Sequence, residues 1–291
     1  MPERRNARPL MPEEWHAWFS VQAGWTQPTR AWLYREAGLD RARAVLEVGC
    51  GTGVIAGEVA RSSPASVVGL DVSEEMLSFA RQGERVVYVR GDAQALPFPD
   101  GRFDVVICHY LLLWLMDPAQ GVREMARVVQ PNGAVLACAE PDYGGRVDHP
   151  PDMASLGRLQ AEALRRQGAD PEIGRRLGEL FVAAGLQATV GVMAGHWDAP
   201  AWPDDEFEAE WAMRERDLSA LLPFEELHRL RSADRRALAA GRRVLFVPTF
   251  YALGRRRVGD RAGRLDGPRA ESATENTSRS KPRSEQCLQE K

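Results

Sequence analysis

A glycine-rich loop beside a carboxylate, in the stretch AVLEVGCGTG at residues 44–53, is the first candidate for chemistry in this sequence. A glycine-rich turn between a strand and a helix lets the backbone approach a ligand at the carboxyl end of a sheet. The dinucleotide pattern G-x-G-x-x-G would need a third small residue after Gly53, but Val54 stands there. Glu47 lies inside the apolar run, where a carboxylate would repel a pyrophosphate and would suit a ligand that carries an ammonium group.

Two further acidic residues close the next two predicted strands. Asp71 lies 20 residues past Gly51, where its carboxylate can accept hydrogen bonds from ribose hydroxyls, and Asp92 can meet an adenine amino group. The sequence has no G-K-[ST] loop of the kind that binds nucleoside triphosphates. The acidic residues therefore suit an amine, a ribose and an adenine, and none of these candidate ligand residues suits a phosphate. S-adenosylmethionine has these groups and a sulfonium, and it carries no phosphate, so the pattern favours it as the ligand.

An alternation of strands and helices must position these residues. Apolar runs predict strands at 44–48, 66–72, 85–92, 102–110 and 134–140, and amphipathic stretches predict helices at 54–61, 73–82 and 119–129. Such an alternation predicts a parallel sheet covered by helices on both faces. Beyond residue 141, helices are expected at 153–167, 173–184 and 204–240, and strands at 187–197 and 242–254.

Four stretches together resemble the class I S-adenosylmethionine-dependent methyltransferases, in the small-molecule group that includes the ubiquinone and menaquinone methyltransferases. They are VLEVGCGTG, VVGLDVSEEML, GDAQALPFPDGRFDVVICHYLLLWLMD and REMARVVQPNGAVLACAEPD, and they span about residues 44–142. The resemblance implies an α/β fold: a seven-stranded, mostly parallel, doubly wound sheet of the Rossmann-like methyltransferase type, with an antiparallel last strand and helical insertions. It also implies transfer of a methyl group to a small-molecule acceptor by in-line displacement.

The resemblance assigns roles by position along these motifs. It gives Asp71 the ribose, Asp92 and Ala93 the adenine, and His109 the wall near the sulfonium. The side chains that would flank the adenosine are those of Val72 and Met76. The residues expected on the methionine side of the cofactor are Glu47 and the loop residues Gly49, Cys50, Gly51 and Gly53.

Catalytic and lid residues are expected at both ends of this core. Tyr143 follows the fifth predicted strand and His109 ends the fourth, so both are expected near the transferring methyl. A general base is needed only if the nucleophile must lose a proton, and His109, Asp142 and Tyr143 are the candidates. In the aromatic helix before the core, Trp25 or Arg30 is expected to contact the cofactor, with Arg30 paired to its carboxylate.

Four regions are expected along the chain: an N-terminal helical lid (1–40), a cofactor-binding Rossmann-like core (41–142), the remaining core strands with helical substrate insertions (143–254) and a disordered tail (255–291). The formal charge of −3 gives no case for nucleic acid, no C-x-x-C pair suggests a metal, and the longest apolar run is too short to span a bilayer. A cytoplasmic location is expected. A non-catalytic S-adenosylmethionine-binding protein and a nicotinamide-dependent oxidoreductase stay as alternatives.

Overall fold

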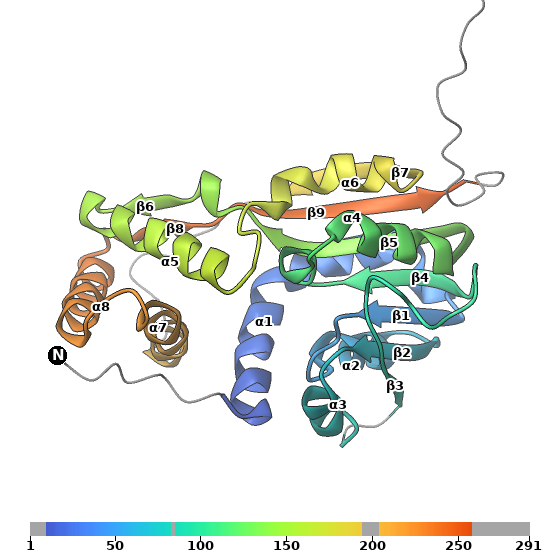
Figure 1. The fold of residues 1–291 in the computed structure, drawn as a ribbon, viewed down its shortest axis with the longest axis horizontal. Coiled ribbons are helices and arrows are strands. Elements are labelled where there is room, and N and C mark those ends of the chain that lie inside the picture. The colour runs from blue at the N-terminus through green and yellow to red at the C-terminus, as the bar shows by residue number, and fades with distance from the viewer. Residues whose placement is uncertain (1–9, 83–84, 194–203, 258–291) are drawn as a thin grey trace, which may run out of the picture.

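The computed structural model describes residues 10–82, 85–193 and 204–257, which form a central sheet with a group of helices beside it (Figure 1). The helices are α1 (Pro12–Ala37), α2 (Val54–Ser62), α3 (Glu74–Ala80), α4 (Pro118–Val128), α5 (Ala154–Arg166), α6 (Leu177–Ala183), α7 (Asp204–Leu218) and α8 (Phe224–Ala239). The strands are β1 (Ala44–Val48), β2 (Ser66–Asp71), β3 (Val86–Arg90), β4 (Phe103–Cys108), β5 (Val129–Pro141), β6 (Val147–His149), β7 (Leu186–Val192), β8 (Val244–Phe246) and β9 (Thr249–Arg256).

The main sheet has seven strands in the order β3-β2-β1-β4-β5-β9-β7. The pairs among β3, β2, β1, β4 and β5 are parallel, and β9 is antiparallel to both β5 and β7. Every residue of β1 is buried, as expected for a central parallel strand covered on both faces. The structure thus confirms the predicted seven-stranded, mostly parallel sheet with an antiparallel last strand.

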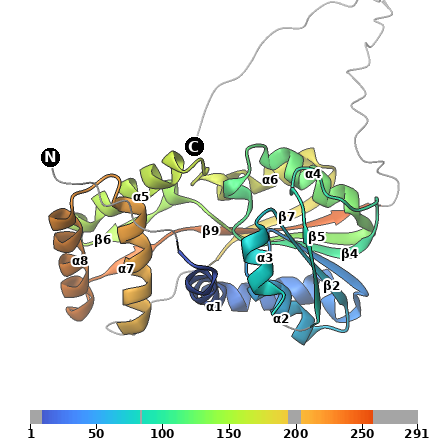
Figure 2. The same cartoon turned by 60° about the horizontal axis from the view of Figure 1, so that its bottom comes forward.

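Helices cover the two faces of the sheet (Figure 2). Alternate residues of β1 belong to two different apolar clusters, one on each face. Val45 packs in a cluster with Leu33 of α1 and Val59 of α2. Leu46 belongs to the opposite cluster, which contains Val122 of α4 and residues of α6. The parallel strands β1 to β5 are therefore held between two apolar layers, and their carboxyl ends share one edge of the sheet.

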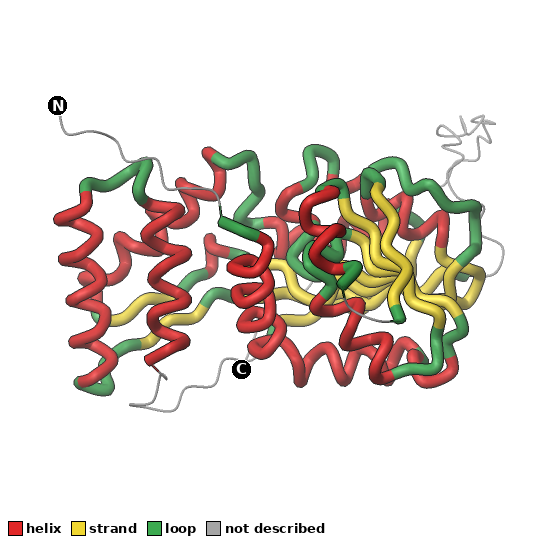
Figure 3. Tube along the Cα trace, turned by 90° about the horizontal axis from the view of Figure 1, so that it is seen from below, coloured by secondary structure: helices red, strands yellow, loops and turns green. Residues whose placement is uncertain are grey.

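The first helix is bent and lies between the sheet and the helical lobe, which we define as α5, α7 and α8 with the β6–β8 pair (Figure 3). Pro28 lies inside α1, where its missing N–H removes a helical hydrogen bond and its ring bends the helix. The helix ends at Gly38, whose φ of 78° is the left-handed conformation of a glycine C-cap. The bend lets the C-terminal half pack under the sheet while the N-terminal half reaches the glycine loop.

Two predictions for the C-terminal part were wrong. The single strand expected at 242–254 is divided, because Pro248 breaks it: β8 pairs with β6 in a separate two-stranded sheet, and β9 joins the main sheet. Arg255 and Arg256, expected at the start of a disordered tail, are the last residues of β9. Residues 258–291 of that predicted tail and the stretch 1–9 lie outside the described residues. Among the residues that the structure describes, no helix is long and apolar enough to cross a membrane.

Candidate cofactor and active site

The loop after β1 has a backbone that only glycine adopts without strain. Gly49, Gly51 and Gly53 have φ values of 73°, 49° and 81°. A Cβ on Gly49 would lie 2.6 Å from the Leu111 side chain, and one on Gly53 would lie 2.2 Å from the Tyr88 hydroxyl. The loop is therefore tightly enclosed by neighbouring side chains, and it lies at the carboxyl edge of the sheet. The turn begins helix α2, as the sequence predicted.

Glu47 has a buried carboxylate that is only partly paired. The residue is 3% exposed, and its carboxylate accepts a hydrogen bond from the backbone N–H of Ala56 at the start of α2. Its Oε2 has no hydrogen-bond partner within the described residues. Burial raises the pKa of this carboxyl well above its usual range. An unpaired buried oxygen is costly, so this position suits a ligand that brings a cationic donor, as the ammonium of S-adenosylmethionine would.

Asp71 and Asp92 lie at the carboxyl ends of β2 and β3, on the same edge as the glycine loop. Asp71 Oδ2 accepts a hydrogen bond from the Gly51 N–H at 2.8 Å, and its Oδ1 accepts one from the Ser73 N–H at 2.9 Å. Asp92 Oδ1 accepts one from the Gln94 N–H at 2.8 Å. Each carboxylate oxygen can accept more than one bond, so both acids keep capacity for a ligand.

The remaining predicted adenosine contacts differ in exposure. Val72 is 67% exposed directly after Asp71, Met76 is half-buried in the first turn of α3, and Ala93 is 7% exposed after Asp92. Cys50, inside the glycine loop, is buried, and burial raises the pKa of its thiol. The structure thus brings the predicted cofactor residues of the core to one edge of the sheet. In the part of the chain that it describes, no group of three or more His, Cys, Asp or Glu side chains can hold a metal ion.

The N-terminal half of α1 covers the glycine loop. His16 Nδ1 lies 3.0 Å from the Thr52 hydroxyl, and the Phe19 ring would lie 3.0 Å from a Cβ on Gly51. Sequence reasoning missed both contacts. Trp25, which was expected to reach the cofactor, is 46% exposed and packs edge-on against Trp18 on the neighbouring face of the helix.

Arg30 was expected to pair with the cofactor carboxylate, and in the structure it is already paired with a carboxylate of the protein. The guanidinium is fully buried between α1 and α2, where both Nε and Nη2 donate to the Glu58 carboxylate. Its Nη1 donates to the Ala23 carbonyl at 2.6 Å and to the Thr26 hydroxyl. In this arrangement the guanidinium is paired with a carboxylate inside the protein, and its charge acts on Glu47 and His109 at the proposed cofactor site.

His109 follows β4 and is held from α1. Its Nε2 lies 2.9 Å from the Thr26 hydroxyl, and its ring packs edge-on against Tyr110 with 4.7 Å between centroids. Burial, together with the nearby Arg30 charge, lowers the pKa of His109 to about 3. The imidazole is therefore neutral at physiological pH and is a weak base. This geometry does not favour the role of His109 as the general base.

The backbone after His109 is fixed by Glu140, a residue at the end of β5. Its fully buried carboxylate accepts hydrogen bonds from the N–H groups of Leu111, Leu112 and Leu113 at 3.0, 2.9 and 3.3 Å. Burial raises the pKa of Glu140 to about 7, against the effect of these bonds. Tyr110 stands in the left-handed region, with a φ of 51°, just before this turn. A strained residue beside a site is a common feature of functional loops.

Tyr143 follows β5 and lies under the charge of Arg146, whose guanidinium carbon is 5.9 Å from the centre of the ring. Burial raises the pKa of Tyr143 to about 12, so the side chain is a neutral phenol. Asp142, the third base candidate, forms an ion pair with Arg175 at 2.6 Å and caps the turn after β5. The Tyr143 ring is thus held beside Arg146, and the Asp142 carboxylate is held by Arg175.

Family comparison now identifies the core. Residues 46–137 match the family model described as a methyltransferase domain. The match includes the glycine loop, Asp71, Asp92 and His109, which the fold brings to one edge. Residues 46–137 are a class I S-adenosylmethionine-dependent methyltransferase domain. The finding favours this family over the nicotinamide-dependent oxidoreductases, in agreement with the missing third glycine.

The relatives of this methyltransferase domain are similar over part of the chain. An uncharacterized methyltransferase of Schizosaccharomyces pombe is 30% identical over 167 residues, which cover 53% of this chain and 60% of that protein. The demethylmenaquinone methyltransferase of Mycolicibacterium gilvum is 42% identical over 114 residues, which cover 39% of this chain and 47% of that protein. The chain thus spans about half the length of the curated relatives it matches.

Solved structures share the fold at low identity. The [4+2]-cyclase SpnF is 21% identical with a TM-score of 0.54, and the match covers 80% of this chain and 81% of that one. A Bacillus halodurans protein named as a candidate methyltransferase is 21% identical with a TM-score of 0.53, covering 78% and 98%. This similarity shows the fold alone, and a fold does not specify a reaction.

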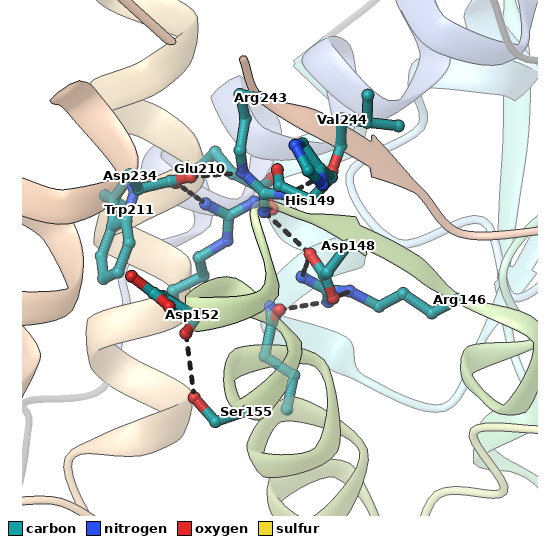
Figure 4. A network of polar contacts seen from close by, with 12 residues as sticks. Arg146, Asp148, His149, Asp152, Ser155, Glu210, Trp211, Asp234, Arg243 and Val244 are labelled. Atoms are coloured by element: carbon teal, nitrogen blue, oxygen red, sulfur yellow. Dashed lines mark hydrogen bonds and ion pairs between the residues drawn. The ribbon is translucent and has the colours of Figure 1, made fainter. Parts of the chain in front are cut away.

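A buried line of ion pairs, shown in Figure 4, joins β6 to α7 and α8 inside the helical lobe. Arg146 pairs with Asp148 at 2.6 Å, Arg243 bridges Asp148 and Asp234, and Arg214 reaches Asp234 at 2.9 Å. All five side chains are at most 4% exposed. Arg146, whose guanidinium lies over the Tyr143 ring, is thus held by ion pairs that continue into α7 and α8.

Proposed function

We propose that this chain transfers a methyl group from S-adenosylmethionine to a small-molecule acceptor by in-line displacement. The observation that carries the proposal is the alignment of one unpaired buried carboxylate, Glu47, with a glycine loop and two strand-end acids on one edge of the sheet. S-adenosylmethionine supplies a methyl group already activated by its sulfonium. The whole chain's activity is part of the proposal, because the relatives match it over only part of their length.

We assign the cofactor contacts as follows. Glu47 accepts from the ammonium, Asp71 accepts from the ribose hydroxyls, and Asp92 accepts from the adenine amino group. The neighbouring apolar groups enclose the adenosine, and the loop backbone lies against the methionine part. These further contacts come from Val72, Met76, Ala93, Gly49, Cys50, Gly51 and Gly53.

Catalysis is proposed to depend on positioning. The sulfur leaves as a neutral group, so the protein's main task is to align the nucleophile with the methyl and to exclude water. His109 and Tyr143 are both neutral side chains, which suits hydrogen bonding to an acceptor better than strong base catalysis. His109→Ala and Tyr143→Phe are expected to lower turnover by about tenfold to a hundredfold, whereas loss of a true base costs about a thousandfold or more.

The acceptor is proposed to be a small molecule recognised beside the helical lobe. Support comes from relatives that are named as quinone methyltransferases, and from the position of Tyr143 between the sheet and α7. A cytoplasmic location is also proposed. No nucleic-acid partner is proposed, because a formal charge of only −3 gives no general case for one.

The deciding experiment is to incubate the purified chain with methyl-labelled S-adenosylmethionine and a metabolite extract, and then to identify the labelled product. Transfer to one small molecule supports the proposal. Tight cofactor binding with no label transferred to any acceptor, in an extract shown to sustain other methyltransferases, would favour the non-catalytic alternative. An Asp71→Ala variant run in parallel shows whether the labelling depends on the proposed site.

A further inference from the structure

A buried chain of polar contacts joins α2 to the active-site edge through α1. Glu58 of α2 binds Arg30, Arg30 donates to the Thr26 hydroxyl, and that hydroxyl lies 2.9 Å from His109 Nε2. Arg30 and Thr26 are 0% and 2% exposed. Water therefore has little access to these two residues, and their hydrogens must be shared among the protein groups around them.

The groups around the Thr26 hydroxyl limit which atom can accept its hydrogen bond. A guanidinium can only donate, so Arg30 uses one lone pair of the Thr26 oxygen. Three acceptors remain for the hydroxyl proton: the Gln22 carbonyl at 3.3 Å, the Ala23 carbonyl at 3.4 Å and His109 Nε2 at 2.9 Å. The Ala23 carbonyl already accepts from Arg30 at 2.6 Å.

The distances favour the imidazole as the acceptor. Hydroxyl donors prefer separations near 2.7–2.9 Å, and interactions beyond about 3.2 Å are weak. A hydroxyl whose oxygen accepts from a cation is also a stronger donor, since successive hydrogen bonds polarise one another. Both effects favour a hydroxyl proton between Thr26 and Nε2 over the alternative, in which Nε2–H donates to the second lone pair of the Thr26 oxygen and the hydroxyl donates to the Gln22 carbonyl.

We infer that Thr26 and Arg30 are positioning residues that hold His109 as the neutral tautomer with its proton on Nδ1. The contact is part-buried, and it uses Nε2, which leaves Nδ1 as the nitrogen that can carry the proton. His109 thus presents an N–H donor from the end of β4. In terms of the proposed function, on which this consequence rests, the donor meets a lone pair of the methyl acceptor, such as a carbonyl, carboxylate or phenolate oxygen.

The arrangement also couples His109 to the docking of α1. Thr26 and Arg30 lie on the same face of α1 as His16, which contacts the glycine loop. When α1 is docked, the tautomer is set and the loop is covered by the same helix. The helix that holds His109 through Thr26 is therefore the same one that covers the glycine loop through His16.

The test is the tautomer itself, read from the imidazole ¹⁵N chemical shifts of histidine-labelled protein, with the His109 signals assigned by their absence in His109→Gln. The wild type is expected to show a pyridine-type Nε2 and a protonated Nδ1. Thr26→Val should move the His109 signals toward a mixture of tautomers, and Thr26→Ser should restore the wild-type pattern. Thr29→Val, on the same helix, is the matched control and should leave the signals unchanged.

A wild-type spectrum with the proton on Nε2 overturns the inference without any variant. An unchanged spectrum in a folded Thr26→Val protein overturns the positioning role. These readouts need no methyl acceptor, so they separate this inference from the proposed function: a confirmed tautomer with no methyl transfer refutes only the latter. Once an acceptor is known, Thr26→Val should lower kcat by about tenfold with little change in cofactor affinity.

Discussion

Asp71→Ala tests the proposed ribose contact and the loop geometry together. The carboxylate accepts bonds from the Gly51 N–H at 2.8 Å and the Ser73 N–H at 2.9 Å, so it ties the glycine loop to the end of β2. Its remaining lone pairs are those proposed to accept from the two ribose hydroxyls. Removing the side chain therefore removes two ligand contacts and loosens the loop that holds the methionine part.

The size of the effect follows from these contacts. A hydrogen bond to a charged group contributes about 1.5 kcal/mol at the low end of its range, so two ribose bonds contribute about 3 kcal/mol. Since about 1.4 kcal/mol is a tenfold change, the dissociation constant should rise on the order of a hundredfold. The Gly51 and Ser73 N–H groups also lose their acceptor in this variant, and this lowers cofactor affinity further only if the loop changes shape.

The matched control is Asp104→Ala. Asp104 also accepts from two backbone N–H groups, those of Arg43 and Ala44 at 2.9 and 2.8 Å, but it lies near the start of β4 at the opposite edge of the sheet. Calorimetric titration with S-adenosylhomocysteine, after circular dichroism shows that both variants fold, should give weaker binding for Asp71→Ala and wild-type binding for Asp104→Ala. An unchanged dissociation constant for folded Asp71→Ala would refute the ribose assignment, and equal losses would point to general destabilisation.

Three further predictions follow from the site and the lobe. By calorimetry, the wild type should bind S-adenosylmethionine at about −8 kcal/mol, a micromolar constant, and NADH far more weakly; tighter NADH binding would refute the cofactor assignment. Asp234→Ala leaves Arg214, Arg243 and the Trp211 N–H without their shared acceptor, so urea unfolding should show a loss of about 3–5 kcal/mol, against little change for exposed Asp152→Ala. Burial lowers the pKa of His109 to about 3, so the unfolded chain binds a proton at higher pH than the folded one. Stability should fall from about pH 6.5 toward pH 3, and His109→Gln should reduce that slope in pH-dependent unfolding; an unchanged slope would contradict a buried neutral ring.

The core could be predicted from sequence because its signals are local. The apolar runs of β1, β4 and β5 are continuous, and the glycine loop stands directly between β1 and α2. These short-range patterns determine strand, turn and helix in order, and parallel strands then bring their carboxyl ends to one edge. The cofactor residues at that edge stay a prediction for this chain, and the unpaired Oε2 of Glu47 is the structural feature that supports it most directly.

The contacts of α1 could not be predicted because they join segments far apart in sequence. His16, Phe19, Thr26 and Arg30 follow helical spacing, so their common face was readable from the sequence. Their partners were not: Thr26 meets His109 83 residues later, and Arg30 meets Glu58 28 residues later. The sequence could not indicate that Arg30 binds Glu58, since any carboxylate within reach satisfies a guanidinium and the sequence does not say which one is near.

The charge state of the site agrees with the chemistry of methyl transfer. A sulfonium needs no protonation to leave, so a strong acid has nothing to do, and a base is useful only when the nucleophile carries a proton that must depart. The two side chains expected nearest the methyl, His109 and Tyr143, are held neutral by burial, and Asp142 is paired with Arg175. Acids with remaining hydrogen-bonding capacity face the side proposed for the ammonium, ribose and adenine. Charge is thus proposed to hold the cofactor, while fixed neutral groups align the acceptor, and an acceptor whose nucleophilic atom is already deprotonated in solution fits such a site best.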